Sequence, residues 1–253
     1  MLRVAELTKS YGHLTALSEV SFSIRPGEVL GLIGPNGSGK TTLFEWLGGV
    51  LPADRGVVLD DPFDSPAGAP AQGRRVLTDQ ERSARIFYLP DGIAPWPTQT
   101  VRWALRFIVG FFGSARSPAE AGRHIDDVVR QLDLTPLLDS RIGTLSKGQR
   151  KRALLAVGLL TPQPILLADE PFDGLDLRQS RDVARTLRQH AAQGRTLLLS
   201  IHQLADAARV CDRFVLISGG RIRGEGTKDE LSAQAASRGA ASTDLEEVFL
   251  ALT

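Results

Sequence analysis

A glycine-rich turn placed directly after a short apolar run constrains this chain more than any other segment. The run spans Val29 to Ile33, and the turn leads into a helix that continues with Thr42-Leu43-Phe44. Because unbroken apolar runs of this length are typical of parallel strands covered on both faces, we expect a buried central strand at 29–33. Strand, tight turn and helix in this order predict a chain of the α/β class.

The turn itself has the pattern of a phosphate-binding loop: a glycine, four residues, then Gly-Lys-Thr. Glycines let successive backbone N–H groups turn inward on phosphate oxygens, and the helix beginning near Lys40 adds the positive end of its dipole. We expect Lys40 to reach the β- and γ-phosphates and Thr41 to offer its hydroxyl to Mg²⁺. An exposed lysine in a plain turn is the alternative, yet residue usage yields this pattern in roughly one chain in a hundred. The expected nucleotide-binding residues are Gly34, Pro35, Asn36, Gly37, Ser38, Gly39, Lys40, Thr41 and Thr42.

Two further apolar runs end in polar residues that suit phosphate chemistry. Ile165 to Ala168 is followed by Asp169 and Glu170, and strand ends are where open α/β sheets place ligands. Asp169 is expected to hold Mg²⁺ through its water shell, while Glu170 polarises an attacking water. A solvated turn is the alternative for either acid alone. Thr196 to Ile201 is followed by His202, whose ring we expect to contact the γ-phosphate or orient water.

The remaining patterns complete an α/β core with a helical insertion. Val20 to Ile24 alternates apolar and polar residues, which predicts a strand of an antiparallel sheet. Other expected features are a helix capped by Ser117-Pro118-Ala119-Glu120, a crossover helix within Ser180 to Gly194, a hairpin turn at Gly219-Gly220 and a surface loop from Asp61 to Gln72.

Composition excludes several classes of protein. The 253 residues are 42% hydrophobic and 23% charged, values that suit a folded core. With a formal net charge of +1, the chain lacks the excess of positive charge that binding to a nucleic-acid backbone generally uses. The single cysteine, Cys211, fits a reducing compartment, and residues 1–10 lack the pattern of a signal peptide. The apolar stretch Trp103 to Phe112 is far shorter than the ~20 residues that span a bilayer, so a cytoplasmic chain is expected.

The segment Leu145-Ser146-Lys147-Gly148-Gln149 resembles the signature sequence of ABC ATPases, with lysine in the middle position. His202 resembles the family's switch histidine, Asp173 to Asp176 its loop after the acid pair, and Tyr11 the aromatic residue that stacks on adenine. The resemblance spans residues 3–225. It implies a P-loop NTPase core with a mainly parallel central sheet, an N-terminal antiparallel β subdomain and an inserted helical subdomain. The implied boundaries are 1–225 for the ATPase domain, 92–150 for the helical subdomain and 226–253 for a helical tail.

The resemblance also implies two copies and a membrane partner. Ser146 and the N–H groups near Gly148 precede a helix and would form a second anion site on a chain that already has one. In the family's head-to-tail dimer, ATP with Mg²⁺ is held between the phosphate loop of one subunit and Ser146, Gly148 and Gln149 of the other. We therefore expect a homodimer that works with an integral-membrane permease at the inner face of the cell membrane, and no nucleic-acid partner.

One position departs from the family pattern. Members usually carry glutamine after a Tyr-Leu-Pro stretch, whereas here Tyr88 to Pro90 is followed by Asp91. A carboxylate can ligate Mg²⁺ or bind water, although beside a triphosphate it adds repulsion unless the metal lies between them. Asp91 is therefore a candidate metal ligand, and Gln99 is a substitute if the loop folds differently.

The direction of transport and the class of ATPase leave alternatives open. Trp96 to Thr100 and the aromatic helix at Trp103 to Phe112 match the region that receives the permease in the family, with the lobe's own core as the alternative. Leu245, Val248, Phe249 and Leu252 resemble the ending of drug- and lipid-export ATPases, so export is expected. Other hypotheses are a soluble ABC ATPase of DNA repair or ribosomes, and a nucleotide-gated regulator without efficient hydrolysis.

Overall fold

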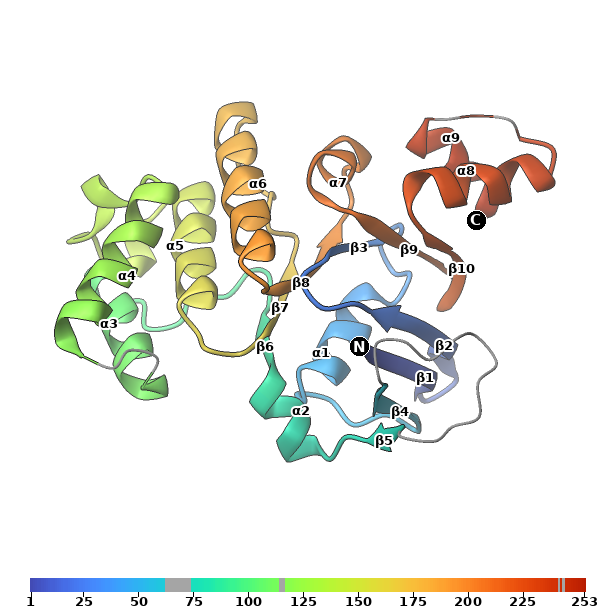
Figure 1. The fold of residues 1–253 in the computed structure, drawn as a ribbon, viewed down its shortest axis with the longest axis horizontal. Coiled ribbons are helices and arrows are strands. Elements are labelled where there is room, and N and C mark those ends of the chain that lie inside the picture. Colours follow the sequence, from blue (N-terminus) through green and yellow to red (C-terminus); the bar gives the residue numbers. More distant parts are fainter. Residues whose placement is uncertain (62–73, 114–116, 241, 243) are drawn as a thin grey trace.

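The computed structural model describes residues 1–61, 74–113, 117–240, 242 and 244–253. The expected surface loop from Asp61 to Gln72 lies outside the described residues except for Asp61 itself. The described residues form two sheets, a group of helices at one end and a pair of helices at the other (Figure 1). Among these residues, we find no helix with the length and apolar character that a membrane crossing requires.

The larger sheet has the strand order β10-β9-β3-β8-β7-β6, and only β10 runs antiparallel to its neighbour. All residues of β3, β7 and β8 are buried, as their unbroken apolar runs predict. The predicted strands at 29–33 and 196–201 and the hairpin at Gly219-Gly220 are confirmed. The strands are β3 (Val29–Ile33), β6 (Ile86–Leu89), β7 (Ile165–Asp169), β8 (Thr196–Ile201), β9 (Arg213–Ser218) and β10 (Arg221–Gly226).

The smaller sheet is antiparallel, in the order β2-β1-β4-β5. The predicted strand at 20–24 is confirmed as the end of a longer strand, in which Val20, Phe22 and Ile24 are buried on one face. The strands are β1 (Leu2–Tyr11), β2 (Leu14–Ile24), β4 (Arg55–Asp60) and β5 (Arg75–Val76). This agrees with the predicted N-terminal antiparallel subdomain.

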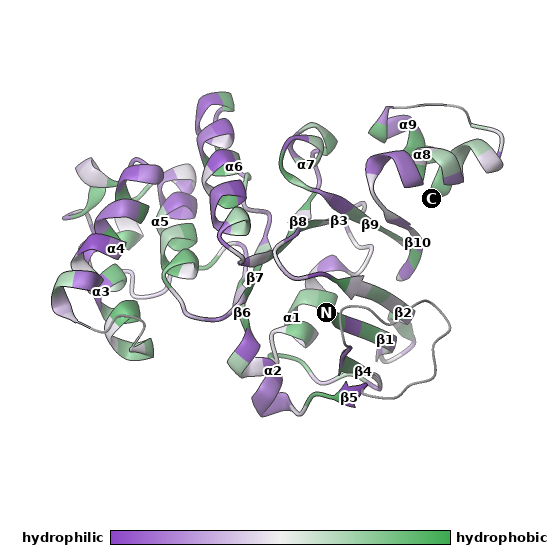
Figure 2. Ribbon diagram, viewed as in Figure 1, coloured by the Kyte–Doolittle hydropathy of each residue, from purple (hydrophilic) through white to green (hydrophobic). Residues whose placement is uncertain are grey.

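Alternate residues of β3 enter two different cores, one on each face of the larger sheet. Leu30 and Leu32 pack with α1 (Lys40–Leu47) and the smaller sheet, whereas Val29 and Ile33 pack with the helices on the opposite face. That face is covered by α6 (Leu177–Ala192) and α7 (Leu204–Val210). In Figure 2, β7 and β8 are largely green and α6 is largely purple, in keeping with a buried sheet and a solvated helix surface.

Three helices form a lobe beside β6 and β7 (Figure 1). They are α3 (Val101–Phe112), α4 (Pro118–Gln131) and α5 (Lys147–Leu159), and short 3-10 turns at Thr135–Leu137 and Ile142–Thr144 connect α4 to α5. Side-chain oxygens of Thr100 and Ser117 accept N–H groups in the first turns of α3 and α4, as predicted for Ser117. A further helix, α2 (Asp79–Arg85), precedes β6.

The chain ends in two helices that lie against β10 (Figure 1). They are α8 (Lys228–Ser237) and α9 (Leu245–Leu252). Leu245, Val248 and Leu252 are buried, so the helical spacing predicted for this segment is confirmed. A Cβ at Gly224 of β10 would lie 2.9 Å from Leu231 and 3.2 Å from Leu252, which shows how closely these helices approach the strand.

Candidate active site

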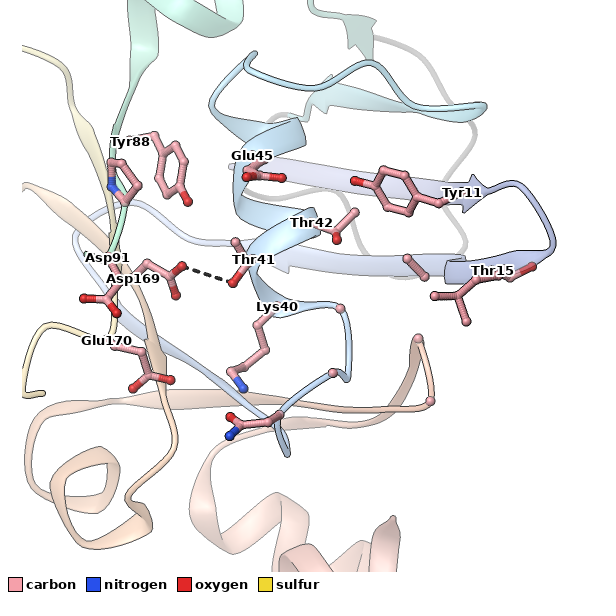
Figure 3. Close-up of a pocket in the computed structure, with 18 of the residues that line it drawn as sticks. Tyr11, Thr15, Lys40, Thr41, Thr42, Glu45, Tyr88, Asp91, Asp169 and Glu170 are labelled. Carbon is pink, nitrogen blue, oxygen red and sulfur yellow. Dashed lines mark hydrogen bonds between the residues drawn. The ribbon is translucent and has the colours of Figure 1, made fainter. Parts of the chain in front are cut away.

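A cavity of about 810 Å³ lies where the phosphate loop meets the carboxyl ends of β6 and β7 and the turn between β1 and β2 (Figure 3). It brings together most of the residues predicted from four separate segments of the sequence. Its lining residues are Tyr11, Leu14, Thr15, Ala16, Asn36, Gly37, Gly39, Lys40, Thr41, Thr42, Glu45, Tyr88, Pro90, Asp91, Ile93, Asp169, Glu170, Gly219 and Gly220.

The phosphate loop has the shape of an anion cradle. Gly37 and Gly39 have φ angles of 78° and 102°, in the left-handed region that favours glycine. A Cβ at Gly39 would lie 2.7 Å from the carbonyl oxygen of Ala16 and 2.6 Å from a methyl carbon of Leu17. The hydroxyl of Ser38 is buried and has no hydrogen-bond partner among the described residues. A bound phosphate would give such a hydroxyl a partner.

Lys40 points into this cradle. Its Nζ donates to the carbonyl oxygens of Gly34 at 2.7 Å and Pro35 at 3.2 Å. Burial lowers the pKa of Lys40, and the negative charges of Glu170 and Asp169 partly oppose that shift. A buried ammonium group that donates to two carbonyl oxygens is well suited to accept a phosphate as its counter-ion.

Thr41 and Asp169 are in direct contact across the cavity, although they are 128 positions apart in the chain. The Thr41 hydroxyl donates to Oδ2 of Asp169 at 3.2 Å, the dashed contact in Figure 3. The Ser200 hydroxyl donates to the other oxygen of the same carboxylate, which fixes its orientation. A hydroxyl and a carboxylate are hard oxygen ligands, so this pair fits Mg²⁺.

Glu170 is held in an uncommon backbone conformation at the end of β7. Its φ is 49°, and its N–H donates to the carbonyl oxygen and the hydroxyl of Ser200, at 3.2 and 3.1 Å. Non-glycine residues in this region are strained, and such strain concentrates at functional sites. Oε2 of Glu170 lies 2.5 Å from Nδ1 of His202. The structure therefore brings together the predicted base and the predicted switch histidine.

Tyr11 lies at the end of the cavity opposite Asp169 (Figure 3). Its side chain is half exposed, and Nζ of Lys9 is 5.4 Å from the ring centroid. The accessible ring and its distance along the cavity from the phosphate loop suit a flat base. Stacking on adenine stays a prediction.

The signature residues are elsewhere on the same chain. Ser146 caps α5: its hydroxyl accepts from the N–H of Gln149 at 3.3 Å, and its own N–H donates to Oε1 of Gln149 at 2.9 Å. A Cβ at Gly148 would lie 2.5 Å from the carbonyl oxygen of Gly174, so only glycine allows this approach. None of the described residues that line the cavity comes from this segment.

Asp91 reaches the cavity as predicted, but it also has a partner that the sequence analysis missed. Nζ of Lys151, on α5, lies 2.5 Å from Oδ1 of Asp91. Burial alone would raise the pKa of the Asp91 carboxyl, but the hydrogen bond and charge of Lys151 outweigh it and hold the pKa below its ordinary value. Its role as a metal ligand stays a prediction. Gln99 is exposed and is absent from the described lining residues.

Other residues of the site were also missed. Glu45, Tyr88 and Thr15 line the cavity, and the Ser200 hydroxyl contacts the Asp169 carboxylate and the backbone N–H of Glu170. The position of Ser200 next to the end of an apolar strand was a usable signal, because a buried hydroxyl there must find a polar partner. The other three lie on α1, β6 and β2 and become neighbours only through the packing of the two sheets.

Comparison with known proteins agrees with this site. A model of the ABC transporter family matches residues 17–173, more than half of the chain. The hemin import ATP-binding protein HmuV of Thermobifida fusca is 35% identical over 238 residues, covering 91% of this chain and 78% of the relative. The Nod factor export ATP-binding protein I of Bradyrhizobium diazoefficiens is 33% identical over 225 residues, covering 88% and 69%.

Solved structures show the same fold. The ATP-binding subunit of an ABC transporter has a TM-score of 0.83 at 29% identity, and the match covers 100% of this chain and 99% of that one. A dimeric ATP-binding cassette with bound ADP and Pi shares the fold at 23% identity, with a TM-score of 0.74 over 90% of this chain and 98% of that one. The phosphate loop, the acid pair and these matches agree: this chain belongs to the ABC transporter family, as one of its ATP-binding ATPase subunits.

Proposed function

We propose that the cavity binds ATP with Mg²⁺ and that five residues of this chain carry hydrolysis. Lys40 holds the β- and γ-phosphates, Thr41 and Asp169 hold the metal, Glu170 acts as base, and His202 positions Glu170. When bound, Mg²⁺ supplies positive charge to the phosphate oxygens as the bond to the γ-phosphate breaks. The contact between Thr41 and Asp169 beside the phosphate loop is the observation that supports the assignment, because a hydroxyl and a carboxylate are both hard oxygen ligands.

In the reaction, Glu170 accepts a hydrogen bond from water and takes its proton as the oxygen–phosphorus bond forms. The oxygen that bridged the β- and γ-phosphorus atoms leaves with ADP. The hydrogen bond between Glu170 and His202 keeps the carboxylate from rotating away from that water. The replacement Glu170→Gln should lower Mg-ATP turnover by at least about a hundredfold while the nucleotide still binds. Unchanged turnover would refute this role.

The proposal includes a second copy of this chain, arranged head to tail. Ser146, Gly148 and Gln149 stand at the start of α5, where a helix N-terminus favours anions, yet the described lining of their own cavity does not include them. A partner's signature would complete the cavity from outside, over Glu170 and the phosphate loop. ATP would then hold the two copies together until it is hydrolysed.

The aromatic surface of α3 is the proposed contact with a membrane permease. Trp103 and Phe107 stack with ring centroids 4.9 Å apart, Phe107 and Phe111 at 5.8 Å, and Trp96 packs edge-on against Trp103. Phe111 is 69% exposed, which is costly for a large apolar side chain unless a partner covers it. A groove of about 270 Å³ beside Trp103 offers a place for such a partner.

Location, direction and domain division are part of the same proposal. A chain that engages a permease in this way would be peripheral on the inner face of the membrane, with residues 1–225 as the ATPase domain, 92–150 as its helical subdomain and 226–253 as a tail. Export rests on the resemblance of α9 to exporter endings, since the matched relatives include proteins named for import and for export.

Co-purification from membranes tests the contact with a permease. If the chain captures no hydrophobic protein, or if a Phe111→Glu variant captures it equally well, the proposed contact is contradicted.

A further inference from the structure

Two lysines on α5 join the helical lobe to the loops that follow β6 and β7. Lys147 and Lys151 are one helical turn apart and therefore share a face of α5. Nζ of Lys147 lies 2.5 Å from Asp173, in the loop after β7, and Nζ of Lys151 lies 2.5 Å from Asp91, in the loop after β6. The two pairs differ in burial: the side chain of Lys147 is 59% exposed and that of Lys151 is 7% exposed.

Lys151 has a second contact at the site. Its Nζ also donates to the main-chain carbonyl oxygen of Asp169, at 3.4 Å. One buried ammonium group therefore touches both the side chain of Asp91, in the loop after β6, and the backbone of the acid that ends β7. A buried cation is tolerated only where it is paired, so its two contacts constrain α5 relative to both strands.

The ion pair between Lys151 and Asp91 affects the charge of a cavity that is rich in carboxylates. Four carboxylates line the cavity, those of Glu45, Asp91, Asp169 and Glu170, and among the described lining residues Lys40 is the lone side chain with a positive charge. A triphosphate adds further negative charge to the same space. Without Lys151, the Asp91 carboxylate would face the triphosphate without its contacting counter-ion, and the charge of the exposed Lys147 would act on it only from a greater distance.

We propose that Lys151 is a positioning residue of the nucleotide site, which neutralises Asp91 and holds the loop after β6 and the carbonyl of Asp169 against α5. The inference rests on the proposed function, because it assumes that Mg-ATP occupies the cavity. On this view the carboxylate at position 91 is tolerated because a lysine is placed to pair with it. The role of the Asp91 carboxylate is then to pair with Lys151, and nucleotide binding does not need it when Lys151 is replaced by a neutral residue.

The test compares single and double variants in a Glu170→Gln background, with Mg-ATP affinity measured by equilibrium dialysis. Lys151→Met should weaken binding by about tenfold, within the range of couplings measured for residues in contact. The double variant Asp91→Asn with Lys151→Met should bind within about threefold of the parent, because neither charge is left unpaired. Lys151→Arg should behave as the parent. Arg130→Met, which removes an exposed ion pair with Asp127 in the same lobe, is the matched control and should change nothing.

Each result decides the matter. Unchanged affinity in Lys151→Met overturns the proposal, even if its melting temperature falls, since that is what a purely structural lysine predicts. A double variant that binds as weakly as Lys151→Met, or more weakly, also overturns it, because Asp91 is then needed in its own right, for example as a metal ligand. If Lys151→Met does not fold, the double variant is compared with the parent: binding within about threefold supports the proposal, and weaker binding overturns it. If the parent itself binds no Mg-ATP, the proposed function fails, and this inference falls with it.

Discussion

Nδ1 of His202 and Oε2 of Glu170 are 2.5 Å apart, which joins the ends of two neighbouring parallel strands in one hydrogen bond. Glu170 follows β7 and His202 follows β8, and Ser200 of β8 accepts the N–H of Glu170. The pair thus depends on the register of the sheet, in which Asp169 lies opposite Ser200. Any change in that register would separate the base from its partner.

Replacing His202 with alanine should lower Mg-ATP turnover by about a hundredfold, because an unsupported Glu170 no longer holds the attacking water in place. Binding of Mg-ATP should change by less than about threefold, since Lys40 and the phosphate loop are untouched. Steady-state kinetics and equilibrium binding measure the two effects. His13→Gln, at an exposed position, is the control. If weaker Mg-ATP binding accounts for the whole loss of turnover, His202 acts in nucleotide binding and not in positioning Glu170.

Thr41→Ala should raise the Mg²⁺ concentration that gives half-maximal turnover by about tenfold, because one hard ligand and its hydrogen bond to Asp169 are lost. Thr41→Ser keeps the hydroxyl and should restore the parent value. The measurement is a Mg²⁺ titration at saturating ATP. If the two variants need equal Mg²⁺ concentrations, the Thr41 hydroxyl is not a ligand of the metal.

Gly39→Ala should damage both the fold and nucleotide binding. Its φ of 102° is strained for alanine, and its new methyl group would meet the Ala16 carbonyl oxygen at 2.7 Å. Such strain costs about 1–3 kcal/mol of unfolding free energy, measurable by urea denaturation. Gly110→Ala, where the added Cβ meets nothing within 4 Å, should leave stability unchanged or slightly raised. Equal stabilities for the two variants would contradict the strained loop.

His190 should make the fold sensitive to mild acid. Burial lowers its pKa from the ordinary 6.5 to about 4, aided by the charges of Arg195 and His124. Between these two pKa values the unfolded chain binds a proton that the folded chain does not. The contribution of His190 to the free energy of unfolding is therefore fully present above the pKa of the unfolded state. It is lost as the pH falls toward the pKa of the folded state. Urea denaturation should show a loss of about 2 kcal/mol from about pH 7.5 to about pH 5 that is absent in His190→Gln. An identical loss in that variant would assign the effect to other groups.

The buried strands were the most predictable part of the fold. Val29–Ile33 and Thr196–Ile201 have the same bounds in the sequence analysis and in the structure, because strands covered on both faces leave an unbroken apolar run. β1 was missed. Its register against β2 shifts at several points and its burial pattern is irregular, so the alternation that marks a strand is broken. Within the expected helical tail at 226–253, the bounds of α8 were not predicted, since its ten residues bury only Leu231 and Ala235.

The candidate site was predictable where one segment carries its own chemistry. The phosphate loop is one continuous segment, and so is the acid pair. Residue types and spacing within each segment were therefore sufficient to predict them. The contact between Asp91 and Lys151 was not predictable in that way. It depends on the rotation of α5 and on the distance between the lobe and β6, which are set by tertiary packing.

In the proposed dimer, ATP joins two copies of this chain through the phosphate loop of one and the signature of the other. Light scattering of the Glu170→Gln variant measures this directly, with and without Mg-ATP. We expect the mass of a dimer with Mg-ATP, the mass of a monomer without it, and a monomer in both conditions when Ser146→Arg is added. A Glu170→Gln variant that stays monomeric in saturating Mg-ATP would show that ATP does not join two copies of the chain.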